Sequence, residues 1–140
     1  MKILYGILIG LGSGFLVGLV MMAADALFYG KFVQETRMAR KYQSMFTQLI
    51  VFMFISVVYG GIQAAIFLWL MPLLPVNVMW RGIVFGLISY LILSRHFAEG
   101  FAFMNPELFP TRVSLYLAIE FLVAYELQGV IISRGLAMLL

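Results

Sequence analysis

Four long apolar stretches constrain this chain more than any other feature of its sequence. They cover residues 3–29, 48–73, 78–95 and 112–133, and an α-helix needs only ~20 apolar residues to cross the hydrocarbon core of a bilayer. The strands of a membrane barrel would alternate apolar and polar residues over ~10 positions, and these stretches do not. Charged residues make up 11% of the chain, against roughly 25% in a soluble domain. We therefore predict an all-α integral membrane protein, with residues 1–140 forming one bundle of four transmembrane helices.

The basic residues predict how these helices are oriented. Six of the nine lysines and arginines lie in or beside the connectors 30–47 and 96–111. Because short cytoplasmic loops are enriched in Lys and Arg, we expect both connectors in the cytoplasm and both termini outside. The inner or plasma membrane of a bacterium or archaeon fits this arrangement. Trp69 and Trp80 flank the turn between the second and third stretches, and they predict an aromatic belt at the outer interface.

Glycines recur every four residues in the first stretch, at Gly6, Gly10, Gly14 and Gly18. A dinucleotide-binding fingerprint would need a third glycine where Phe15 stands, between a strand and a helix, so nucleotide binding is disfavoured. Small residues at this spacing let two transmembrane helices approach closely. Gly82 and Gly86 repeat the spacing in the third stretch. We expect the first stretch to pack against the third, or against the first stretch of a second copy.

Asp25 extends the glycine face, because it lies seven residues beyond Gly18 and seven residues return to almost the same side of a helix. The acid is therefore predicted to point into protein. We interpret it as a structural ion pair or an anchor at the helix end, with a functional carboxylate as the alternative.

The last stretch carries two acids, Glu120 near the predicted midplane and Glu126 closer to the outer side. A charged side chain at such depth costs roughly 2.5–3.5 kcal/mol on insertion scales, so it faces a partner or a wet cavity. From helical spacing and depth we expect Glu120 to pair with Ser56, Tyr59 or Ser89. We expect Glu126 to pair with Arg81 or Gln63. These groups are either polar contacts between helices or a site that titrates a proton or anchors a ligand.

No other chemistry stands out in the sequence. The chain has no cysteine and one histidine, His96, which with Glu99 is too little for a metal site. We predict no cofactor, with a bound lipid or quinone as the alternative. The net charge of +3 resides mainly in the connectors, so a nucleic-acid partner is not expected. Enzymatic activity stays open, but we do not expect this chain to catalyse a reaction on its own.

Some motifs resemble those of known membrane proteins. Asp25-Ala26-Leu27, Arg81-Gly82 with Phe85-Gly86-Leu87, and a polar final helix are similar to small four-helix bacterial membrane proteins of unassigned function, a likeness that implies no activity. The glycine-rich residues 10–14 followed by Glu120 resemble the proteolipid rotor subunits of rotary ATPases. Glycine ladders are missing from the second and fourth stretches, however. The small multidrug transporters are similar in size, but their essential glutamate lies in the first helix, where this chain has only Asp25.

Two functions are compatible with this sequence. The first is a small accessory or structural subunit of a larger membrane complex, respiratory or otherwise energy-converting, that packs through its glycine-rich first helix. Its partners would be the lipid bilayer and other membrane subunits. The alternative is a homo-oligomeric, proton-coupled transporter or channel in which Glu120 titrates.

Overall fold

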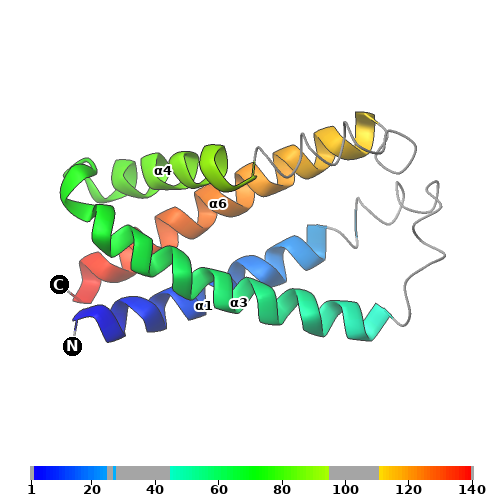
Figure 1. Cartoon of the computed structure of the whole chain (residues 1–140), viewed down its shortest axis with the longest axis horizontal. Coiled ribbons are helices and arrows are strands. Elements are labelled where there is room, and N and C mark those ends of the chain that lie inside the picture. The colour runs from blue at the N-terminus through cyan, green and yellow to red at the C-terminus, as the bar shows by residue number, and fades with distance from the viewer. Residues whose placement is uncertain (1, 25–26, 28–44, 95–110, 140) are drawn as a thin grey trace.

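The computed structural model describes residues 2–24, 27, 45–94 and 111–139 and is helical almost throughout this part of the chain (Figure 1). Four helices form the bundle: α1 (Lys2–Ala24), α3 (Met45–Leu70), α4 (Val78–Ser89) and α6 (Thr111–Leu139). A 3-10 turn, Met71–Leu73, follows α3, and α4 continues into a π-helical segment, η4, at Tyr90–Ser94. The predicted all-α class with four helices is confirmed for the described residues.

Three of these helices contain an apolar segment long enough to cross a membrane. The segments are Ile3–Ala24, Met53–Leu73 and Leu115–Leu139. The fourth apolar helix, Val78–Leu93, is shorter. The last helix extends beyond the predicted end at residue 133, to Leu139, and its Gly135 packs against Ile9 of α1.

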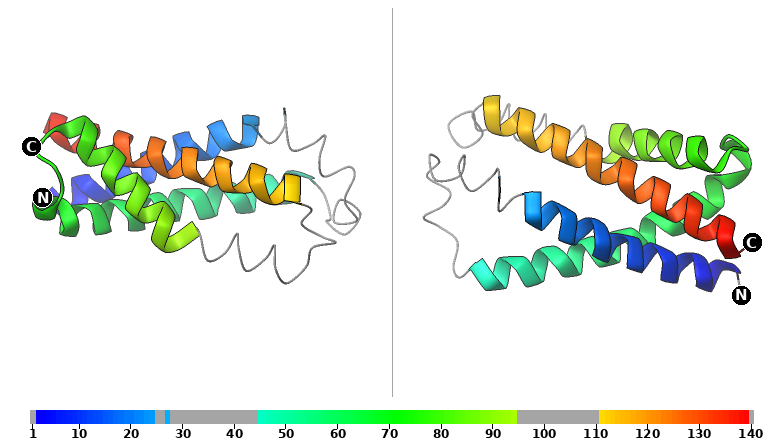
Figure 2. Two further views of the ribbon diagram at one scale, coloured as in Figure 1. Left: turned by 90° about the horizontal axis from the view of Figure 1, so that it is seen from above. Right: turned by 180° about the vertical axis from the view of Figure 1, so that it is seen from behind.

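The helices form two antiparallel pairs. α1 packs along α3, α4 packs along α6, and the pairs meet mainly where α6 crosses α1 (Figure 2). α3 and α6 run in the same direction, and both termini lie at the end of the bundle where α3 turns into α4 (Figure 1). The sequence predicted that the first stretch packs against the third. Within one chain that prediction is wrong, since the main neighbours of α1 are α3 and α6.

An apolar core lies where the helix pairs meet. It consists of Ala64, Phe67, Phe85, Ile132 and Leu136, contributed by α3, α4 and α6. The rings of Phe67 and Phe85 meet edge to face with their centroids 4.9 Å apart, an arrangement favoured by aromatic quadrupoles.

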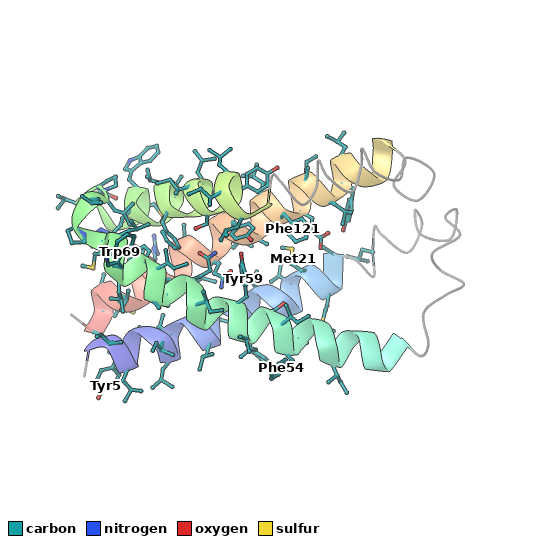
Figure 3. The ribbon with its side chains drawn as sticks, in the orientation of Figure 1. Tyr5, Met21, Phe54, Tyr59, Trp69 and Phe121 are labelled. Carbon is teal, nitrogen blue, oxygen red and sulfur yellow. The ribbon has the colours of Figure 1, made fainter. Side chains whose placement is uncertain are left out.

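The outer surface is apolar as well. Tyr5 and Phe54 project away from the bundle (Figure 3) and are 48% and 69% exposed. The two tryptophans beside the turn, Trp69 and Trp80, are 79% and 60% exposed, so neither is packed inside this chain.

The turn between α3 and α4 is closed by two polar side chains. Asn77 caps α4, because its Oδ1 accepts hydrogen bonds from the backbone N–H groups of Met79 (2.9 Å) and Trp80 (3.2 Å), as a helix-capping residue does. Arg81 reaches back to the turn, where its Nε donates to the Pro75 carbonyl at 2.9 Å and its Nη2 to the Val76 carbonyl at 3.0 Å. These bonds fix the direction in which α4 leaves the turn.

Candidate functional site

The four glycines of α1 lie in the interior of the fold. All four are buried, and a β-carbon on Gly10 would lie 2.5 Å from the β-carbon of Ala64 and still closer to the Gly60 carbonyl oxygen. Gly14 faces the backbone of Ser56 and Val57. The absence of side chains at these positions therefore allows the backbones of α1 and α3 to come together.

The partner surface on α3 was not anticipated from the sequence, although the signal is there. Ser56, Gly60 and Ala64 are also small residues spaced by four, and they receive Gly10, Gly14 and Gly18 of α1. Gly6, at the other end of the ridge, faces Leu68 and Leu136 instead.

Gly82 and Gly86 bring α4 close to α6. A β-carbon on Gly82 would lie 2.6 Å from the α-carbon of Val130, and one on Gly86 would lie 2.7 Å from the carbonyl oxygen of Tyr125. Gly129 completes this contact from α6, because it faces the backbones of both α4 glycines. The hydroxyl of Ser133, one turn further, donates to the Val78 carbonyl at 2.7 Å.

We call five buried or partly buried polar side chains of α3, α4 and α6 the interior polar cluster. The hydroxyls of Tyr59 and Tyr125 share a hydrogen bond of 2.8 Å, and the Ser89 hydroxyl donates to Oε1 of Gln63 at 3.0 Å. The fifth member is Gln128, which is 6% exposed. Figure 3 shows Tyr59 pointing from α3 into the bundle.

Aromatic rings line one side of this cluster. The ring of Tyr125 meets those of Tyr59 and Tyr90 edge to face, at centroid distances of 6.0 and 6.4 Å. Tyr125 is therefore the residue that joins α3 to η4, and sequence reasoning missed it. Its position three residues before Gln128, on the same side of a helix, was the available signal.

Several of the predicted site residues have hydrogen-bond partners that differ from those expected from the sequence. Tyr59 bonds to Tyr125 and Ser89 donates to Gln63, whereas the expectation paired these groups with the two glutamates. Arg81 donates to the turn carbonyls rather than extending to Glu126. Glu120 and Glu126 are both partly buried on α6, and Ser56 is partly buried against α1. The prediction for Asp25 lies outside the described residues.

Within residues 2–24, 45–94 and 111–139, no group of three or more His, Cys, Asp or Glu side chains is placed to hold a metal ion. His96 and Glu99 belong to the connector 96–111, outside the described residues. The groups gathered in the interior polar cluster are thus uncharged hydroxyls and carboxamides. They are suited to hydrogen bonding.

Comparison with known proteins gives this arrangement no counterpart. No family model matches the chain, and neither the curated proteins nor the solved structures contain a significant match.

Proposed function

We propose that this chain is an integral membrane protein that serves as a structural subunit of a larger membrane complex. Three segments have the length and apolar character of membrane spans, and the exposed surface of the helices is rich in large apolar side chains such as Phe54 and Ile92. Lipid is the solvent that such a surface requires, because water would leave it unstable.

The main support for the subunit role is the first half of α6, where no side chain from Leu115 to Ala124 is fully buried. The buried positions of α6 begin at Tyr125. Glu120 lies within this half, where it interacts within the chain and still remains only partly buried. Ionisable side chains inside a membrane face protein or a wet cavity rather than lipid, so a helix of another subunit is the partner that best covers this surface.

Purification in a mild detergent followed by native mass spectrometry tests this role. We expect the chain to be recovered with one or more different membrane subunits in fixed stoichiometry. A bulky substitution on the exposed half, Ile119→Trp, should weaken that association. The control Leu87→Trp, on the exposed side of α4, should leave it intact. Recovery solely as a free monomer, or as a homodimer without partners, contradicts the proposal.

The alternative is a homo-oligomeric, proton-coupled transporter. It is favoured by the series Tyr116, Glu120, Ala124 and Gln128, which follow one another at steps of four along α6 and end in the interior polar cluster. In this function Glu120 takes up and releases the proton. The carboxamide variant Glu120→Gln should abolish pH-driven flux in proteoliposomes, whereas the matched variant Glu126→Gln on the same helix should retain it. Unchanged flux in Glu120→Gln removes this residue from the mechanism.

A further inference from the structure

Two carboxamides of the interior polar cluster are buried with hydrogen-bonding capacity unused. Gln63 is 1% exposed and Gln128 is 6% exposed, and neither Nε2 atom has a hydrogen-bond partner. Almost all buried polar groups in proteins are hydrogen-bonded, so an exception calls for a physical explanation. The need is greater inside a bilayer, where solvent water is absent.

The positions of these two glutamines can be related to the Tyr59–Tyr125 hydrogen bond. Gln63 follows Tyr59 by four residues on α3, and Gln128 follows Tyr125 by three residues on α6. Because α3 and α6 run in the same direction (Figure 1), both glutamines lie on the same side of the tyrosine pair. Each is about one helical turn, roughly 5–6 Å, further along its helix. Helical spacing therefore places the two glutamines at similar levels along α3 and α6.

The chemistry of this region selects an uncharged ligand. Its members are phenol hydroxyls, a serine hydroxyl and two carboxamides, and none of these carries a charge to balance an ion. The Ser89 hydroxyl already occupies Oε1 of Gln63, which leaves the N–H groups of Nε2 to donate. Rotating this carboxamide by half a turn would place Nε2 beside Ser89 and leave Oε1 unpaired instead. The Ser89 hydroxyl donates to Oε1, so the orientation found in the structure leaves Nε2 as a donor that requires an accepting oxygen.

We propose that Gln63 and Gln128 form a binding site for an uncharged oxygen that accepts hydrogen bonds from their Nε2–H groups. Water is one source of this oxygen, because buried water molecules commonly bond to otherwise unpaired buried polar groups. The carbonyl or hydroxyl oxygen of a lipid-soluble molecule offers the same chemistry. The site is independent of the subunit role, because it is built from side chains of this chain alone.

Solid-state NMR on proteoliposomes containing the full chain with ¹⁵N-labelled glutamine tests the site. If water supplies the oxygen, magnetisation passes from water protons to the side-chain Nε2–H₂ groups of both Gln63 and Gln128. If a lipid-soluble molecule supplies it, this transfer is absent, and solvent extraction of the membranes shifts both side-chain signals. Absence of water transfer, with signals that do not change on extraction, overturns the proposal.

Two variants separate the site from general hydration of the bundle. Gln128→Met keeps the length of the side chain and removes its donors, so the signal of Gln63 should lose its contact with the ligand or shift. Ser133→Ala is the matched control, since Ser133 is buried to a similar degree on α6 but already donates to Val78. This control should leave both glutamine signals unchanged. A Gln63 signal that is identical in wild type and Gln128→Met contradicts a shared site, and the wild-type measurement decides the matter if that variant does not fold.

Discussion

Gly10 and Gly12 are two residues apart on α1 and have opposite surroundings. Gly10 is buried against Gly60 and Ala64, whereas nothing lies within 4 Å of the position that a β-carbon on Gly12 would take. The two positions therefore separate the effect of a methyl group on helix packing from its effect on helix propensity.

We expect Gly10→Ala to destabilise the protein and Gly12→Ala to leave it unchanged or slightly more stable. At Gly10 the new methyl group meets backbone atoms that cannot move without separating α1 from α3, and overpacking of this kind typically costs about 1–3 kcal/mol. At Gly12 the change meets open space and gains up to about 1 kcal/mol of helix propensity. Unfolding in detergent micelles, followed by the helical circular dichroism signal, measures both. Equal effects at the two positions would contradict the packing of α1 on α3.

The sequence predicted where the helices lie, but not which helices pack against each other. The apolar stretches 48–73 and 78–95 correspond closely to α3 with its 3-10 turn and to α4 with η4, because length and hydropathy are properties of one segment. Pairing depends on two surfaces at once. The ridge on α1 was visible, but its match with Ser56, Gly60 and Ala64 required comparing the small residues of every helix.

The interior polar cluster shows the same limit for the candidate site. Helical spacing identified Tyr59 and Gln63 as polar positions facing protein, and both lie in the cluster. The partner of each was not predictable. Spacing gives a direction around a helix but not the rotation of the neighbouring helix, which is why Tyr125 was missed and Arg81 was assigned to Glu126.

The start of α4 supplies a prediction about Arg81. Since its guanidinium donates two exposed hydrogen bonds to the carbonyls of Pro75 and Val76, Arg81→Met should lower stability by about 0.5–1.5 kcal/mol, the usual net contribution of such bonds. If Arg81 stabilises the protein only through the turn carbonyls, Arg81→Met should lower the stability of the wild-type protein and of the Glu126→Gln variant by the same amount. Thermal unfolding of Arg81→Met, Glu126→Gln and the double variant forms the necessary cycle. A coupling above about 0.5 kcal/mol between the two positions would instead indicate an Arg81–Glu126 interaction.

Among the described residues, the buried positions of α6 lie toward the end of the bundle that holds the turn after α3. The termini and the turn after α3 gather at one end (Figure 1), and the buried positions of α6 lie in its second half, from Tyr125 to Leu136. If α4 and α6 each cross the membrane, as expected for four transmembrane helices, the turn and the C-terminus must be on the same side of the membrane.

Labelling of single cysteines tests that consequence, and the absence of natural cysteines makes the unmodified chain its own background control. Val76 and Leu139 are 89% and 56% exposed, so Val76→Cys and Leu139→Cys should react equally with a membrane-impermeant maleimide added to intact cells. Glu99→Cys, in the connector for which the basic residues predict a cytoplasmic location, should react only after the membrane is permeabilised. A reversed pattern at all three positions would invert the orientation and keep the four-helix topology. Labelling of Val76→Cys and Leu139→Cys from opposite sides would contradict that topology, because α4 and α6 together would then cross the membrane an odd number of times.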